Sequence, residues 1–334
     1  MEQNNMEHNV SLTVIVPCYN VEKYLDDSLK SLEQQWDGRT DYEIILVNDA
    51  SQDGTIHKLN QFKEKYPDNV VIIDKQVNQG VSAARNSALD IARGKWVTFF
   101  DPDDVLVHGG YARLLELTEQ GGFDILRFGV VIVNDESVSE SPIASEPFRI
   151  NWKGGSLDYM LDNSFGISTA YLYKREVLGD NRFQPLTICE DTVFNLPILL
   201  ADIPIAKTES KVYYYIVRPS SATTTINPAK LSRHSDDIFK AINILEDFKE
   251  GRSEEMKSRL TKHQWIFSPN LLTRLLLSDQ KVSDIKPKLE GLSKLSLFPL
   301  QGSGLMSRLM NMVYQHLWLL PLVRPVYRLY RNRS

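Results

Sequence analysis

The sequence predicts an α/β fold, with a mostly parallel sheet flanked by helices and a helical region after it. Short apolar, β-branched runs alternate with segments of helical periodicity through the first half of the chain. Each apolar run ends in polar turn residues, and from about residue 226 the pattern is helical throughout. With 334 residues, 42% of them hydrophobic, the chain can bury one large core or two smaller ones.

The predicted strands are apolar runs bounded by turn residues. In chain order they occupy residues 11–20, 42–47, 70–73, 96–100, 123–133, 170–174 and 211–217. Amphipathic helices are expected between the early strands and after Thr187, where apolar side chains recur at helical spacing. The Ser-rich, acidic segment 134–147 is predicted to be an exposed loop. In the last part of the chain, helices are predicted over 229–249, 253–277, 282–295 and 305–330.

Composition excludes several classes of protein. The formal net charge of −5 argues against a general nucleic-acid binder, which needs a basic surface. The two cysteines, Cys18 and Cys189, lie far apart without CxxC spacing, which argues against a zinc site or a disulfide framework. The first eleven residues lack the apolar core of a signal peptide, and no apolar segment is long enough to span a bilayer. We therefore expect a cytoplasmic protein.

Three carboxylates within four residues follow the predicted strand at 96–100. Because like charges repel, Asp101, Asp103 and Asp104 favour a hard divalent cation with oxygen ligands. Pro102 bends the chain so that Asp101 and Asp103 face the same side of the turn. The carboxyl ends of parallel strands are also where ligands bind in open α/β sheets. The alternative is a solvated acidic turn that caps the next segment.

Other polar residues follow the neighbouring strands, so that one sheet edge should gather Tyr19, Asp49, Gly80, Arg85 and Asp101. A nucleotide could bind at this edge. The first turn has no GxGxxG and no GxxxxGK[ST], which argues against dinucleotide binding and against an NTPase phosphate loop. A metal ion would then have to neutralise the phosphates.

Five motifs in order resemble those of family 2 glycosyltransferases with the GT-A (Rossmann-like) fold. The resemblance covers roughly residues 12–221, and its motifs are 14–20, 47–55, 78–86, 101–104 and the pair Glu190-Asp191. It implies a GT-A domain over 10–225, with a donor half at about 10–105 and an acceptor half at about 106–225. A C-terminal helical region would then occupy 226–334. One departure is Ala50, where glycine is more usual, and we expect it to alter the turn only slightly.

The resemblance also assigns roles to single residues. It implies that Tyr19 and Asp49 hold the base of a nucleotide sugar, most often uridine, and that Arg85 touches the base or its phosphates. Asp101 would bind ribose and, with Asp103, a divalent metal ion such as Mg²⁺ or Mn²⁺. Arg218 would lie close to the diphosphate, and Asp191 would act as the general base. Pro17 and Gly80, which belong to the same motifs, complete the expected donor site.

Structural alternatives remain for several of these residues. Tyr19 and Asn20 could cap the first helix, and Asp49 could be an ordinary turn residue. Asp191 stands where a helix cap would be favoured, and an arginine on a helix, such as Arg85, is usually solvated.

The implied activity is a metal-dependent, inverting transfer of a sugar from a nucleotide-diphosphate donor, such as a UDP-sugar, to a hydroxyl acceptor. The acceptor would be a saccharide or a lipid-linked saccharide in cell-surface polysaccharide or glycolipid synthesis. One alternative is a sugar-nucleotide pyrophosphorylase, although segment 21–24 supplies no Gly-rich basic loop. Another is a non-catalytic nucleotide-sugar-binding or membrane-assembly protein of the same fold.

The end of the chain is basic and aromatic. No acidic residue follows Glu290, and the segment combines arginines with Trp318, Leu322 and Tyr327. This composition is typical of an amphipathic helix on the inner face of a membrane. A helix docked on its own domain is the alternative.

Overall fold

The computed structural model describes residues 10–36, 38–134, 142–143, 146–163, 166–218, 227–301 and 304–331. Most of the loop predicted at 134–147 lies outside these residues. The chain forms two compact units. Unit 1 holds the described residues up to Pro185 together with Glu190–Arg218, and unit 2 holds Leu186–Cys189 and the described residues after Arg218.

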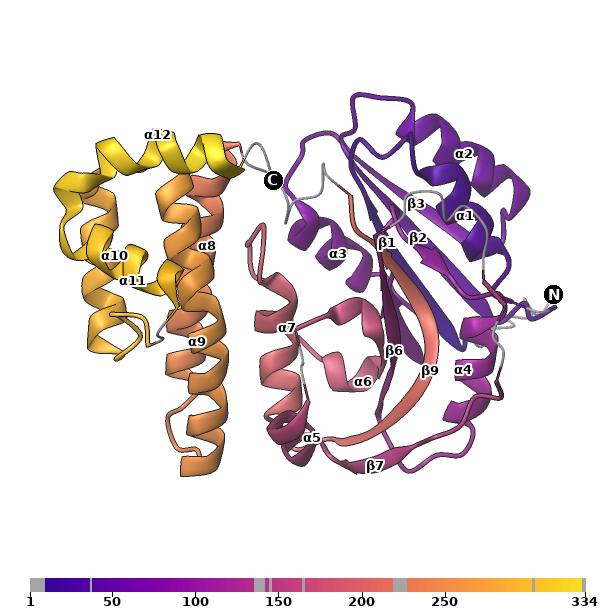
Figure 1. Ribbon diagram of the computed structural model, residues 1–334. Helices are drawn as coiled ribbons and strands as arrows, with labels where there is room; N and C mark the ends of the chain where they lie inside the picture. Colours follow the sequence, from indigo (N-terminus) through magenta and orange to yellow (C-terminus); the bar gives the residue numbers. More distant parts are fainter. Residues whose placement is uncertain are drawn as a thin grey trace, which may run out of the picture. The chain divides into compact units, whose positions relative to one another are not determined.

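Unit 1 is built on one mixed sheet (Figure 1). Its strands are β1 (Leu12–Cys18), β2 (Tyr42–Asp49), β3 (Val70–Lys75), β4 (Trp96–Phe99), β5 (Val105–Leu106), β6 (Ile125–Val133), β7 (Trp152–Gly155), β8 (Tyr171–Lys174) and β9 (Pro204–Ile216). Their order is β3-β2-β1-β4-β8-β6-β9-β5, with β7 paired to β9. The first four strands of this order run parallel, as predicted, whereas β8 pairs antiparallel with both β4 and β6.

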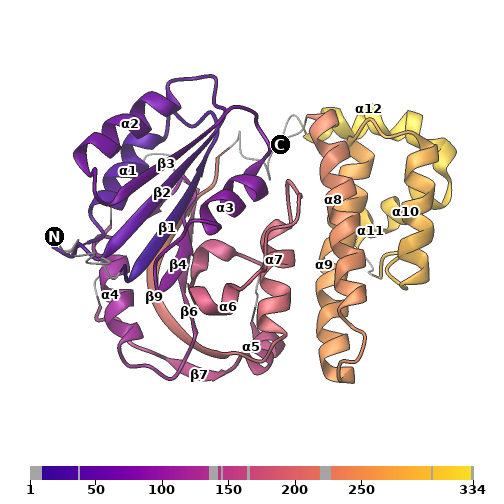
Figure 2. The same cartoon turned by 180° about the vertical axis from the view of Figure 1, so that it is seen from behind.

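Helices cover both faces of this sheet. They are α1 (Leu25–Glu33), α2 (Thr55–Lys65), α3 (Val81–Leu89), α4 (Gly110–Thr118), α5 (Ser156–Asp162), η1 (Ser168–Ala170), α6 (Arg175–Leu178) and α7 (Glu190–Leu199). Both views show α1, α2 and α4 on one face and α3, α6 and α7 on the other (Figures 1 and 2). The apolar residues predicted on α1, which are Leu25, Leu29 and Leu32, are buried in the core.

Strand register aligns the loops that carry the predicted site. Pro17 of β1 pairs with Val47 of β2, and Ile15 pairs with Phe99 at the end of β4. The loops that follow β1, β2 and β4 therefore start at one edge of the sheet. β1 and β2 are buried along their whole length, which explains why their sequences are continuous apolar runs rather than alternating ones.

Two features of unit 1 differ from the prediction. β9 begins at Pro204 rather than at 211, and its polar first half pairs with β6 on one side and β7 on the other. The strands β5 and β7 are too short for their sequence pattern to predict them. Each forms a strand only by pairing with β9.

Unit 2 is helical, as expected. Its helices are α8 (Pro228–Asp247), α9 (Glu254–Leu277), α10 (Val282–Lys294), α11 (Leu305–Gln315), η2 (Leu317–Leu319) and α12 (Leu320–Arg331). Side-chain caps start the first two, because Asn227 accepts from the N–H groups of Ala229 and Lys230, and Ser253 accepts from that of Met256. None of the helices described has the length and apolarity that a bilayer crossing requires.

The single helix predicted over 305–330 is two helices in the structure. α11 ends at Gln315, His316 has a non-helical backbone (φ −124°, ψ 69°), and α12 begins at Leu320. Pro321 explains the break, because it lacks an N–H and its ring would clash with the carbonyl of Leu317 in a continuous helix. In the first turn of a new helix the same proline is tolerated.

Candidate active site

The loop after β2 is held through Asp49. Its buried carboxylate accepts hydrogen bonds from the N–H groups of Gln79 and Gly80, at 3.0 and 2.7 Å, and pairs with Lys75 at 2.9 Å. Gly80, with φ of 88°, then starts α3 in a conformation that favours glycine. Ala50 also adopts a left-handed φ, of 59°, which explains why glycine is more usual there.

The loop after β1 is tied to the loop after β2 and does not cap a helix. The Asn20 side chain accepts from the N–H of Gln52 at 2.7 Å, and α1 begins only at Leu25. Tyr19 is 46% exposed, whereas Pro17 is buried within β1. Tyr19 is therefore free of the helix-capping role that the sequence left open.

Arg85 is the centre of the site, and it is buried rather than solvated. Its Nη2 contacts Asp101 at 2.9 Å, and its Nη1 contacts both Glu190 and Asp191 at 3.0 Å. Burial would lower the pKa of Arg85, but the charges of Asp191, Asp101 and Glu190 outweigh it and raise that pKa. One guanidinium thus joins carboxylates from the predicted donor half and the predicted acceptor half.

Asp191 lies in the first turn of α7, yet the bonds that hold it come from other segments. The Ser168 hydroxyl donates to Oδ1 at 2.7 Å, and the Ser168 N–H donates to Oδ2 at 3.1 Å. Burial raises the pKa of Asp191, although Arg85 and the bonds from Ser168 oppose this rise. The carboxylate is oriented by a second residue, as a general base must be.

Glu190 is a site residue to which the sequence assigned no role. Burial, followed by the charge of Asp191, raises the pKa of its carboxyl to about 7, and Arg85 opposes this. The pairing with Arg85 could not be predicted, because residues 85 and 190 belong to distant segments. Ser168 was missed for the same reason.

The Asp-rich turn after β4 divides its three carboxylates between two tasks. Asp104 is buried and accepts hydrogen bonds from the Tyr213 hydroxyl, at 2.6 Å, and from the N–H of Ile216, at 2.8 Å. The Tyr213 hydroxyl also accepts from the N–H of Asp101 at 3.2 Å. Asp104 therefore fastens the turn to the end of β9, and the expectation that all three carboxylates face a cation is wrong for this residue.

Asp103 stands beside Arg218, the residue predicted near the diphosphate. The two side chains approach to 3.8 Å, and the guanidinium of Arg218 lies 4.3 Å from the ring centre of Tyr24. Burial and the neighbouring Asp101 raise the pKa of Asp103 to about 6, with Arg218 opposing. Pro219, Ser220 and Ser221, the rest of the Arg-x-x-Ser motif, lie outside the described residues.

The charge of this cluster fits a cation. Asp101, Asp103, Asp104, Glu190 and Asp191 stand against two guanidinium groups, those of Arg85 and Arg218. Burial, and after it the charge of a neighbouring carboxylate, raises the pKa values of Asp103 and Glu190. Within the part of the chain that the structure describes, no three His, Cys, Asp or Glu side chains form a complete metal site. Asp101 and Asp103 could supply two oxygen ligands, with others from a bound diphosphate.

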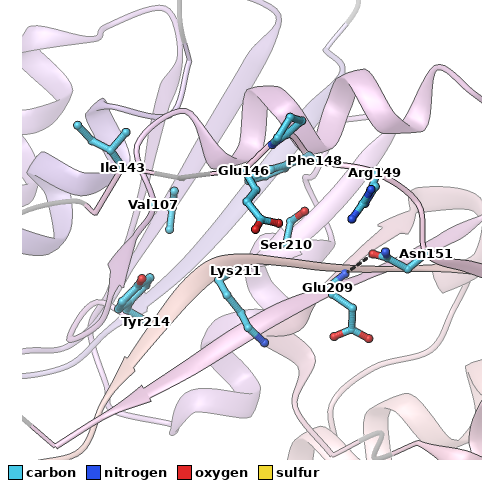
Figure 3. Close-up of a pocket in the computed structure, with 11 residues that line it drawn as sticks. Val107, Ile143, Glu146, Phe148, Arg149, Asn151, Glu209, Ser210, Lys211 and Tyr214 are labelled. Atoms are coloured by element: carbon cyan, nitrogen blue, oxygen red, sulfur yellow. Dashed lines mark hydrogen bonds between the residues drawn. The ribbon is translucent and has the colours of Figure 1, made fainter.

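A separate pocket of about 340 Å³ lies along β9 (Figure 3). Its lining residues are Val107, Ile143, Glu146, Pro147, Phe148, Arg149, Asn151, Glu209, Ser210, Lys211 and Tyr214. None of them belongs to the predicted donor site. Its charged residues balance, since Glu146 and Glu209 face the same pocket as Arg149 and Lys211.

Solved structures with this architecture define the class of the fold. The Staphylococcus aureus protein TarS, residues 1–349 in complex with UDP, superposes with a TM-score of 0.62 at 21% identity, covering 97% of this chain and 92% of that one. A mannosyltransferase from Pyrobaculum calidifontis, in complex with GDP-Man and Mn²⁺, gives a TM-score of 0.55 at 15% identity over 97% and 84%. The fold is GT-A, as predicted.

The family follows from the sequence. The model of glycosyl transferase family 2 matches residues 13–181, more than half of the chain, and the chain belongs to that family. A poly(ribitol-phosphate) β-glucosyltransferase of Bacillus spizizenii is 28% identical over 269 residues, which cover 78% of this chain and 41% of the relative. The chain therefore spans less than half the length of that relative. Family membership favours the glycosyltransferase reading over the pyrophosphorylase alternative.

Proposed function

We propose that this chain is an inverting, metal-dependent glycosyltransferase that moves a sugar from a nucleotide-diphosphate sugar to a hydroxyl group. One observation carries the proposal: Arg85 holds Asp101, from the predicted donor half, and Asp191, from the predicted acceptor half, within 3.0 Å of its guanidinium nitrogens. A site for group transfer needs donor and acceptor groups side by side. Membership of glycosyl transferase family 2 supports the same reaction class.

Asp191 is the proposed general base. A direct displacement at the anomeric carbon requires the acceptor hydroxyl to lose its proton as the new bond forms. Asp191 is 19% exposed at its side chain, is oriented by Ser168 and has a raised pKa, so it can both reach solvent and hold that proton. Asp101 and Asp103 would hold the divalent ion, which when bound offsets negative charge on the departing diphosphate.

The donor and acceptor classes are also proposals. TarS, which shares the fold, is solved with UDP, so UDP-sugars are the first donors to test, with Tyr19, Asp49 and the loop at Gly80 as the base-side residues. The Bacillus spizizenii relative is named for a poly(ribitol-phosphate) acceptor. We therefore expect a cell-surface polymer or a lipid-linked saccharide as the acceptor, with the catalytic domain over residues 10–225.

The Asp191→Asn variant tests this proposal. It should keep its fold and its donor affinity while the transfer rate falls about 10²–10⁴-fold, the usual range for losing a general base. The matched control is Asp124→Asn, the same change in unit 1 at a carboxylate that pairs with Lys174 outside the site. Transfer, donor binding and thermal unfolding are measured for both. Transfer at the wild-type rate in Asp191→Asn would remove this residue from the mechanism.

A further inference from the structure

From residue 318 to residue 329, which covers most of α12 and the end of the turn before it, every exposed side chain is apolar. Among residues 318–329, all of which the structure describes, the exposed ones are Trp318, Pro321, Leu322, Pro325, Val326 and Leu329. Four of these are large side chains, with exposed fractions of 71% for Trp318, 64% for Leu322, 67% for Val326 and 60% for Leu329. The spacing of Leu322, Val326 and Leu329 places them on one side of α12, and Trp318 precedes them in η2. We call these four residues the apolar stripe.

Arg324 and Arg328 of α12 lie on its opposite side, against the rest of unit 2. Arg324 donates to the carbonyl of Leu275 at 3.0 Å, and Arg328 donates to the carbonyls of Leu277 and Ser278 at 3.0 and 2.6 Å. These carbonyls end α9, where cationic side chains are favoured. Val323 and Tyr327 pack against the core of the same unit.

A surface helix usually buries its apolar side and exposes its charges, whereas α12 has apolar residues on both sides and keeps Arg324 and Arg328 against unit 2. Arg324 and Arg328 are therefore not the residues of this segment that would meet lipid headgroups. α12 packs against the other helices of unit 2 through its inner side. The apolar stripe lies on the other side and has no protein partner in the described part of the chain. An exposed patch of this kind marks an interaction surface.

We propose that the apolar stripe inserts into the surface of an anionic lipid bilayer. Charge distinguishes this occupant from a second copy of the chain. The sequence after Glu290 holds no acidic residue, and besides the docked Arg324 and Arg328 it holds Lys294, Arg308, Arg331 and Arg333. Two copies meeting through this segment would bring like charges together, whereas anionic headgroups would offset them. Trp318 suits the boundary between headgroups and acyl chains.

Vesicle sedimentation tests the proposal with the full chain. The wild type should pellet with phosphatidylcholine vesicles that contain phosphatidylglycerol, and part of this binding should survive high salt because apolar insertion is not screened. The double variant Leu322→Glu/Val326→Glu should bind at least tenfold more weakly. The matched control is Ile266→Glu/Val282→Glu, which adds the same charges at two exposed apolar residues of unit 2 outside the stripe, and it should bind like the wild type.

Three results would overturn the proposal. The wild type could stay in the supernatant with every vesicle, or the stripe variant could pellet as well as the control. Sedimentation velocity without lipid could instead show a dimer that only the stripe variant loses, which would make a second copy the occupant. Thermal unfolding checks that both double variants fold, and Leu322→Gln/Val326→Gln replaces the glutamate variant if it does not. Vesicle binding is read without a donor, so it is independent of transferase activity.

Discussion

Arg85 shows how one side chain can link two parts of a site. Its guanidinium contacts Asp101, Glu190 and Asp191, and it lies 5.1 Å from the ring centre of Phe183. The fixed fork of a guanidinium can serve several carboxylates while stacking on an aromatic ring, and a lysine ammonium cannot do both. Lysine at this position would therefore be a disruptive change despite its equal charge.

Glu190 predicts a pH dependence of stability. Its pKa rises from 4.5 to about 7 on folding, so between these values the folded state binds more protons than the unfolded state. The free energy of unfolding, measured with a chelator present, should therefore fall as the pH rises through this range. For this residue the fall is at most about 3–4 kcal/mol, since one pKa unit is about 1.4 kcal/mol. Urea denaturation between pH 4.5 and 8 measures it.

The Glu190→Gln variant isolates this contribution. A neutral amide cannot titrate, so the variant should lose part of the slope and gain relative stability above pH 7. Equal slopes for the variant and the wild type would show that other carboxyls carry the pH dependence.

Tyr213 predicts a cost in stability when its hydroxyl is removed. In Tyr213→Phe, the buried carboxylate of Asp104 would lose one of its hydrogen bonds, and the N–H of Asp101 would lose its acceptor. Leaving buried polar groups unpaired costs about 1–3 kcal/mol, which urea denaturation can measure. Tyr214→Phe, the same change at the next, half-buried residue of β9, should stay within about 0.5 kcal/mol. Equal stability of the two variants would contradict the role assigned to Tyr213.

At the scale of elements, the sequence predicted what local pattern determines. β1, β2, β4 and α7 appear where buried apolar runs and helical spacing placed them. β5, β7 and the first half of β9 escaped prediction because these short or mixed segments become strands only through partners far along the chain. The break at His316 was missed because the effect of Pro321 on the preceding turn was not weighed against the apolar periodicity.

In the candidate site, too, the sequence predicted the positions of residues along the chain but not their contacts in the fold. Motif order placed Asp49, Asp101 and Asp103 correctly at the ends of β2 and β4. It gave no sign that Asp104 turns inward to Tyr213, or that Ser168 would orient Asp191, because both depend on tertiary contacts. A sequence records which residues follow a strand, but the partner of each side chain depends on the packed fold.

At the scale of the molecule, the proposed ligands bind within unit 1, so they should stabilise that unit selectively. Two compact units can unfold in separate transitions, and only the transition of unit 1 should respond. At a concentration of about 100 times Kd, a ligand adds about 2.7 kcal/mol, which corresponds to several degrees in Tm. Calorimetry with UDP and Mn²⁺ measures this shift.

The Asp103→Asn variant connects this shift to the metal. Losing the charge of one ligand should weaken Mn²⁺ and UDP binding together, so most of the shift should disappear. Asp124→Asn should keep it. A wild-type shift that is the same with UDP and EDTA as with UDP and Mn²⁺ would argue against a metal at Asp101 and Asp103.

The contacts that hold the Asp49 carboxylate would limit attempts to change the proposed donor by mutation. This carboxylate already binds Lys75 and the N–H groups of Gln79 and Gly80, and Gly80 is the N-cap of α3, the helix that carries Arg85. Replacing Asp49 alone, to alter the contact proposed for the nucleobase, would loosen the start of α3 and displace Arg85 from its carboxylates. A transplant between family members should therefore move the aspartate, the lysine and the loop together as one block.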